Sequence, residues 1–152
     1  IEALEFGLSE ELLFRGIFTN NMMRVWGCQK HGIYRTMIIT ALLCAAADSI
    51  NTAVHGLDAG VWVHIGYAAA LGLMFSAVYL RTGTLWGCII LHTLTVLASY
   101  MNAGSAVLPS SANAAWMAIT CMTAAAFAAA AFFLVRPSRQ DEIKANWNLT
   151  QK

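Results

Sequence analysis

Ser9-Glu10-Glu11-Leu12-Leu13-Phe14-Arg15-Gly16 decides how this sequence is interpreted, because it places three charged side chains inside an apolar helical segment. Residues 3–26 are rich in Leu, Phe, Ile and Met and contain no Pro, so they predict one long helix. Glu11 and Arg15 are four residues apart and are expected to pair on one face of that helix. Glu10 is turned by about 100° around the helix axis and can face elsewhere.

The composition indicates a protein that lives in a lipid bilayer. Hydrophobic residues make up 59% of the 152 residues and charged residues 11%, against roughly 25% charged residues in a typical soluble domain. The mean hydropathy is +0.60. The net charge of +1 gives no electrostatic basis for a nucleic-acid partner, and none is expected. The cysteines lack C-x-x-C spacing and are interpreted as small buried hydrophobic residues: Cys28, Cys44, Cys88 and Cys121.

Apolar segments of about 20 residues, the length that crosses the hydrocarbon core of a bilayer, recur along the chain. We expect membrane-spanning helices at residues 3–26, 33–54, 61–80, 84–101 and 114–135. The predicted fold is therefore an all-α membrane protein, a bundle of about five transmembrane helices. The third of them carries small residues at every fourth position, Ala68, Gly72 and Ser76, which lets another helix approach closely. The sequence begins at Ile1 inside a helical pattern, which suggests the C-terminal part of a longer multi-span protein.

The basic residues fall on one side of this layout. Most of the nine Lys and Arg residues lie in the first connection, the third connection or the tail: Arg24, Lys30, Arg35, Arg81, Arg136, Arg139, Lys144 and Lys152. Alternating crossings place these three regions on one face of the membrane, which the positive-inside rule makes cytoplasmic. We therefore expect a membrane-embedded core at residues 1–135 and a polar cytoplasmic tail at residues 136–152.

Few ionisable residues remain at membrane depth, where charges are costly and are usually kept for function. They are Glu10, Glu11, Arg15, Asp48, His55, His64 and His92. At 1.5 Å per residue, His92 lies about 12 Å and Glu11 about 20 Å from the cytoplasmic ends of their helices, so long side chains and modest tilt bring them together. His55 ends the second helix near the outer boundary, and it meets the glutamates only if that helix tilts or runs deeper.

Acidic and imidazole groups in one apolar bundle are suited to activating water, because one group takes a proton while another steadies the developing negative charge. A Glu with two His is also a ligand set for Zn²⁺, although the H-E-x-x-H signature is absent from the sequence. Two other interpretations stay open. The histidines are hydrogen-bonded structural residues, or the acidic and imidazole groups carry protons in a transporter, for which inverted repeats or broken helices are the expected sign.

Glu10-Glu11-x-x-x-Arg15-Gly16, a His ending the next helix, and Thr82-Gly83-Thr84-Leu85-Trp86 with His92 beyond it resemble the CPBP family. This is the CAAX-protease and bacteriocin-processing (Abi) group of intramembrane proteases, and the resemblance covers residues 6–98. It implies that Glu10 activates water with help from His55, and that Glu11 and Arg15 orient the site. It also implies that His92 binds the oxyanion. If members use a metal, its ligands here are Glu10, His55 and His92, with zinc as the cofactor.

The sequence departs from the family pattern in two places. The second motif is usually F-x-x-x-H, but Asn51 stands where Phe is expected before His55. The third is usually H-x-x-x-N or H-x-x-x-D, but Val96 stands four residues after His92. Loss of one oxyanion donor costs about 10²–10³ in rate unless another group replaces it. Asn51 and Thr95 are the candidates for a supporting or oxyanion-binding role.

The resemblance implies an intramembrane endopeptidase in the plasma membrane of a bacterium. Its substrate would be a membrane-associated peptide or protein, such as a prenylated C-a-a-X tail or a leader peptide. The reaction would use a water activated by Glu and His, with or without metal. The alternative is a non-catalytic member that binds a peptide or gives self-immunity to a bacteriocin, which the departures at Asn51 and Val96 favour.

Overall fold

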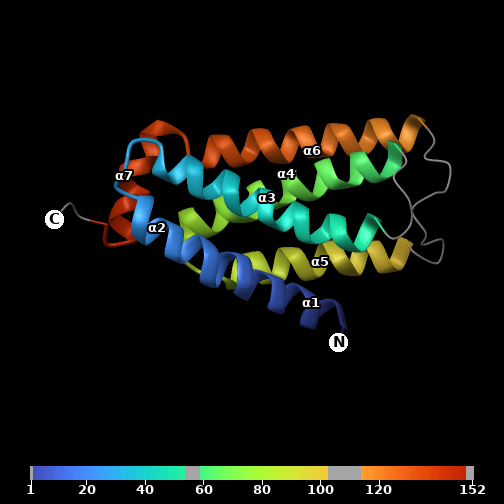
Figure 1. Cartoon of the computed structure of the whole chain (residues 1–152), viewed down its shortest axis with the longest axis horizontal. Coiled ribbons are helices and arrows are strands. Elements are labelled where there is room, and N and C mark those ends of the chain that lie inside the picture. The colour runs from blue at the N-terminus through green and yellow to red at the C-terminus, as the bar shows by residue number, and fades with distance from the viewer. Residues whose placement is uncertain (1, 54–58, 103–113, 150–152) are drawn as a thin grey trace.

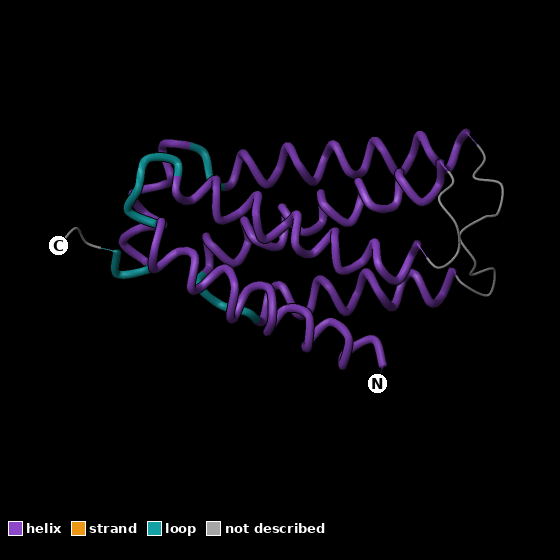
Figure 2. The backbone as a smooth tube through the Cα atoms, viewed as in Figure 1, coloured by secondary structure: helices purple, strands orange, loops and turns teal. Residues whose placement is uncertain are grey.

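The computed structural model describes residues 2–53, 59–102 and 114–149, and within these ranges the chain forms helices joined by short turns, with no strand (Figure 2). In chain order the helices are α1 (Glu2–Glu11), the π-helix η1 (Leu12–Thr19), α2 (Asn20–Trp26), α3 (Gly32–Ala53), α4 (Ala59–Thr82), α5 (Trp86–Asn102), α6 (Ala114–Leu134) and α7 (Pro137–Asn146). The first three follow one another without a break and form a single rod, which corresponds to the helix predicted at residues 3–26 (Figure 1).

The fold is an all-α membrane-type bundle, as the composition predicted. Three helical stretches are long and apolar enough to cross a membrane by length and composition: Gly32–Ile50 in α3, the whole of α4, and the whole of α6. The apolar stretch of α5, Trp86–Ser99, is shorter. The rod is not among these candidate spans, since its three helices have 10, 8 and 7 residues. Of the five expected spans, α3, α4 and α6 thus meet the criteria of length and apolar composition, whereas the rod and α5 do not.

Helix α4 lies at the centre of the bundle. It packs against α3 on one side and α6 on another, and α5 and α7 also contact it. At the outer edge of the bundle, the α1 part of the rod packs along α5, while η1 and α2 contact α3 (Figure 1). The small residue Gly72 lets α3 come close, since a Cβ built on it would lie 3.1 Å from the Cα of Ala41. The predicted close approach at the small residues of α4 is therefore present.

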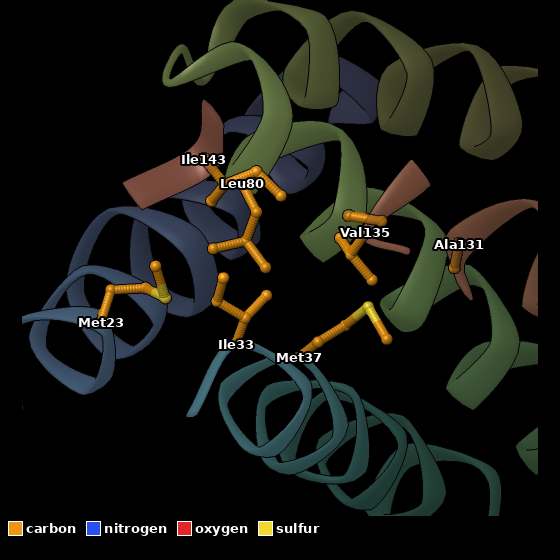
Figure 3. Close-up of a cluster of buried hydrophobic side chains, with 8 residues drawn as sticks. Met23, Ile33, Met37, Leu80, Ala131, Val135 and Ile143 are labelled. Carbon is orange, nitrogen blue, oxygen red and sulfur yellow. The ribbon is translucent and has the colours of Figure 1, made fainter. Parts of the chain in front are cut away.

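One end of the bundle holds the main apolar core. Side chains from α2, α3, α4, α6, α7 and the residue directly after α6 meet there, with no more than 1% of their surface exposed (Figure 3): Met23, Ile33, Met37, Ala77, Leu80, Ala131, Val135 and Ile143. This cluster fixes the helices at the end where the turn between α2 and α3 and helix α7 lie (Figure 1). The regions that carry most of the basic residues therefore gather at the same end.

Helix α7 gives structure to the segment expected as a polar tail. Pro137 occupies its first turn, a position that suits Pro because the missing N–H has no helical partner there. Ile143 is fully buried, and the indole Nε1–H of Trp147 donates to the carbonyl oxygen of Leu80 at 3.1 Å. The charges of this segment predict a polar tail. The apolar side chains of Ile143 in α7 and of Trp147 directly after it pack on the bundle and set the position of α7.

Candidate active site

Glu11 and Arg15 form a fully buried ion pair where α1 passes into η1. Arg15 Nη1 donates to Glu11 Oε1 at 2.9 Å, and neither side chain has exposed surface. Arg15 Nη2 donates to the carbonyl oxygen of Gly72 on α4 at 3.0 Å. The guanidinium also lies 5.5 Å from the ring centre of Phe75, on the same helix. The pair expected from the four-residue spacing is present, and it ties the rod to α4.

His92 on α5 joins this pair. Its Nδ1 lies 2.8 Å from Glu11 Oε1, the same oxygen that accepts from Arg15. An ionised carboxylate can only accept, so Nδ1–H is the donor and the tautomer of the neutral ring is fixed. The ring packs against Phe75, with ring centres 5.3 Å apart. Arg15, Glu11 and His92 thus form a hydrogen-bonded chain that runs from α4 through the rod to α5.

Glu10 lies on the other side of His92. Glu10 Oε2 is 3.8 Å from His92 Nε2, and 26% of its side chain is exposed, whereas Glu11 is completely enclosed. The two adjacent carboxylates therefore have different surroundings, as their angular separation on a helix predicted. Glu11 holds the imidazole in place, and Glu10 is open to solvent or substrate.

The glutamates stand where the helix changes type. Residues Leu12–Thr19 form a π-helix, and the hydroxyl of Thr19 donates to the carbonyl oxygen of Phe14, five residues earlier, at 2.9 Å. π-helical turns are rare and occur frequently at functional sites. The widened turn begins directly after Glu11 and contains Arg15, so it shapes the stretch that holds the buried ion pair.

The turn between α4 and α5 brings His92 back to the rod. Gly83 has a positive φ of 68°, a conformation that glycine adopts without steric cost. Its N–H donates to the carbonyl oxygen of Tyr79 at 2.8 Å, which closes the end of α4. The Thr82-Gly83-Thr84-Leu85-Trp86 run therefore acts as a compact reversal, after which α5 packs along α1.

A cavity of about 200 Å³ opens beside these groups, between α1, α3, α4 and α5. Its acidic and imidazole groups are Glu10, Asp48, His64 and His92. Apolar and aromatic side chains, among them Phe6, Leu71 and Phe75, form much of the remaining wall. An apolar cavity with a few convergent polar groups is the usual form of a small-molecule or peptide site.

The structure brings together four of the residues expected at the site: Glu10, Glu11, Arg15 and His92. His55 lies outside the described residues. Asn51 lies in α3, but its side chain is outside the described part of the structure. The hydroxyl of Thr95 lines the cavity and donates to the backbone carbonyl of His92 at 2.7 Å. Val96 also lines the cavity, so the position that departs from the family pattern faces the site.

Sequence reasoning gave no role to the pair formed by Asp48 and His64. His64 Nε2 lies 3.1 Å from Asp48 Oδ2, and both line the cavity. The two residues lie on different helices, so no spacing rule along one helix links them. Their presence among the few ionisable groups at membrane depth was the only signal in the sequence.

Within the described ranges, no three His, Cys, Asp or Glu side chains lie close enough together to hold one metal ion. The zinc set suggested by the sequence needs His55, which is not among the described residues. Glu10 and His92, the two members of that set that the structure describes, do not form a metal site by themselves.

A comparison with family models supports the sequence resemblance. The model described as Type II CAAX prenyl endopeptidase Rce1-like matches residues 3–98, which include the rod, α3, α4 and most of α5. No curated protein matches the chain, and no solved structure matches it either. The match covers every residue that surrounds the cavity except Ser99.

Proposed function

Because this chain belongs to the Type II CAAX prenyl endopeptidase Rce1-like family, we propose that it cleaves a membrane-associated peptide with a water molecule activated by Glu10. The family is one of proteases, and the apolar helices make the chain an integral membrane protein. The observation that carries the proposal is the buried chain Arg15–Glu11–His92, which ends beside Glu10 at the cavity wall.

Glu10 is the group placed to act as a base. Its carboxylate lines the cavity and is partly exposed, so water and a peptide carbonyl can both reach it. Removal of a proton from water produces the nucleophile, and hydroxide adds to the carbonyl carbon of the scissile bond. Glu11 cannot share this role, because it is enclosed and holds Arg15 and His92.

His92 is the group placed to meet the negative charge that develops on the carbonyl oxygen. Its Nδ1–H is held by Glu11, so Nε2, on the side of Glu10, is the nitrogen that can face substrate, and it donates a hydrogen bond there in the imidazolium form, in which both ring nitrogens carry a proton. A donor held in place before the reaction stabilises an oxyanion without reorganisation. Val96 supplies no second donor, so His92 carries more of this stabilisation than it would with an Asn or Asp in that place.

We propose a prenylated C-a-a-X tail as the substrate, with a leader peptide as the other candidate. The family description names a prenyl endopeptidase. The cavity has an apolar wall that suits an aliphatic residue or part of a prenyl chain. A substrate anchored in the same bilayer also needs no separate recognition of its position relative to the membrane.

The test compares Glu10→Gln and His92→Ala with the parent protein in lipid vesicles, using a farnesylated C-a-a-X peptide and mass spectrometry of the products. We expect kcat to fall by at least about 10²-fold in each variant. Glu5→Gln makes the same chemical change at an exposed position of α1 and should leave kcat unchanged. Cleavage by Glu10→Gln at the parent rate would rule out Glu10 as the base.

The second candidate is a non-catalytic member that binds a peptide. Val96 on the cavity wall favours it, because that position has lost the hydrogen-bonding side chain of the family pattern. This function predicts that the parent binds the farnesylated peptide without forming product. It also predicts that Glu10→Gln leaves the dissociation constant within about twofold, since no reacting atom depends on the carboxylate.

A further inference from the structure

We propose that His64, oriented by Asp48, is a second catalytic imidazole of this site and carries the proton from Glu10 to the leaving amine. The inference rests on the proposed peptidase function and deepens it. It concerns two residues that the family motifs quoted above do not include.

The pair places a carboxylate directly beside an imidazole nitrogen. Asp48 Oδ2 lies 3.1 Å from His64 Nε2, which is an ion-pair distance. A carboxylate at one ring nitrogen fixes the tautomer and the orientation of the ring. With the N–H of His64 on Nε2, beside Asp48, the lone pair of the neutral ring is on Nδ1.

The pair faces the same space as Glu10 and His92. All four residues line the cavity of about 200 Å³. Glu10 and His92 come from α1 and α5, which pack together, while Asp48 and His64 come from α3 and α4, which also pack together. A peptide in the cavity would therefore lie between two walls, each with one carboxylate and one imidazole. Figure 1 shows these two helix pairs side by side in the bundle.

The exposure of the pair suits a group that meets substrate. The side chains of His64 and Asp48 are 34% and 36% exposed, whereas the structural pair Glu11–Arg15 is completely enclosed. The nearby hydroxyls of Thr95 and Ser99 donate to backbone carbonyls of their own helix. On this side of the cavity, His64 is thus the side chain with a ring nitrogen available for proton transfer.

The proton balance of the reaction gives His64 a task. Glu10 takes one proton from water, and the oxygen of that water forms a bond to the carbonyl carbon. The C–N bond then breaks, and the leaving nitrogen needs a proton to depart as an amine. His64 Nδ1 accepts the proton from Glu10, directly or through a water, and donates it to that nitrogen. The new carboxylic acid loses its own proton to solvent, and both Glu10 and His64 return to their starting states.

The test exploits the leaving group. His64→Ala and His64→Gln are assayed on a farnesylated peptide and on the matching ester with a nitrophenolate leaving group, which departs without protonation. We expect kcat on the peptide to fall by about 10²–10⁴-fold with KM little changed. On the ester, both variants should stay within about tenfold of the parent. Added imidazole should restore part of the activity of His64→Ala on the peptide. The His64 side chain lines an open cavity, so a free imidazole can occupy the space that the substitution leaves.

The control removes an imidazole elsewhere. His31 lies in the turn between α2 and α3, away from this cavity, and has a positive φ of 64° that Asn tolerates. His31→Asn should cleave both substrates like the parent and show no response to imidazole.

The positioning role of Asp48 has its own readout. Asp48→Asn should lower kcat on the peptide, and combining it with His64→Gln should cause no further loss, because Asp48 acts only through His64. In ¹⁵N spectra of the labelled ring, Asp48→Asn should change the tautomer of His64.

The outcomes separate the two proposals. Parent-like peptide cleavage by His64→Ala, together with loss in Glu10→Gln, overturns this inference and keeps the peptidase function. An equal fall of kcat on the peptide and on the ester also overturns it, because His64 would then not act by protonating the leaving group. Absence of any cleavage by the parent overturns the peptidase function itself, and the role of His64 with it.

Discussion

At the scale of single residues, Arg15 links the rod to α4 through one guanidinium. It pairs with Glu11 at 2.9 Å and donates to the Gly72 carbonyl at 3.0 Å, and it has no exposed surface. Glu11 in turn holds His92. Loss of Arg15 would leave a buried carboxylate whose remaining partner is an imidazole, which makes this position sensitive both for stability and for the site.

We predict that Arg15→Ala destabilises the protein by about 3–5 kcal/mol, because removing one partner of a buried pair leaves the other charge uncompensated. The free energy of unfolding in mixed micelles measures this. Arg139→Ala is the matched control, because Arg139 pairs with Glu142 at 3.1 Å while 47% of each side chain is exposed. That change should cost no more than about 1 kcal/mol. Equal effects of the two substitutions would contradict the prediction.

Much of the residue-level site was predictable from the sequence. The Glu11–Arg15 pair follows from helical spacing, and the meeting of Glu11 with His92 follows from their depths in neighbouring helices. The Asp48–His64 pair did not follow, because a contact between two helices depends on their rotation and tilt. Those quantities are set by packing at positions such as Gly72 and Ala41, and no local pattern reports them.

At the scale of helices, α4 offers a comparison between two glycines in different surroundings. A Cβ on Gly72 would lie 3.1 Å from the Cα and 3.4 Å from the Cβ of Ala41, while a Cβ on Gly66 would meet nothing within 4 Å. Both glycines lie inside the same helix, so they share the same cost in helix propensity. Their difference reports how closely α3 and α4 pack.

We predict that Gly72→Ala destabilises the protein by about 1–3 kcal/mol, because α3 must move away from α4. The same change at Gly66 should be neutral or stabilise by up to about 1 kcal/mol through helix propensity. Thermal unfolding in detergent compares the two variants with the parent. If Gly72→Ala proved as stable as Gly66→Ala, the close approach of the two helices would be wrong.

The helices themselves were largely predictable. The five expected segments correspond to the rod and to α3, α4, α5 and α6, and they follow from apolar runs of the right length, whereas α7 lies in the segment that was expected only as a polar tail. The π-helix was not predictable, because Leu12–Thr19 consists mainly of residues that are equally suited to an α-helix. Within this stretch, Arg15 contacts α4 at the carbonyl oxygen of Gly72, a long-range contact that no local sequence pattern reports.

At the scale of the whole molecule, α7 packs against one end of the bundle and stabilises it. Ile143 enters the apolar core, and Arg81 at the end of α4 donates to Glu142 Oε2 at 2.8 Å. Hydrogen bonds from Arg81 and then Arg139 hold the pKa of the Glu142 carboxyl below its usual value of 4.5. Because the pKa of Glu142 is lower in the folded protein, its ionised carboxylate stabilises the fold when the pH is above 4.5. This contribution is lost as the pH falls below that value.

We predict that acid loosens α7 before the bundle unfolds. Hydrogen exchange of its amides, corrected for intrinsic rates, should rise as the pH falls below about 4.5. Glu142→Gln should already exchange faster at neutral pH and lose most of this pH dependence. Asp141 is 98% exposed, so Asp141→Asn serves as the control and should keep the parental profile. A pH response retained in Glu142→Gln would assign it to another group.

The π-helix has a consequence for anyone who maps this protein by scanning mutagenesis. Each residue added to a turn rotates everything beyond it by about 100° relative to an α-helix. One helical wheel drawn over residues 2–26 will therefore put either Glu10 or Met23 on the wrong side, although both belong to one rod. Lipid-facing and protein-facing positions should be assigned from two separate helical wheels, one for the residues before the π-helix Leu12–Thr19 and one for the residues after it.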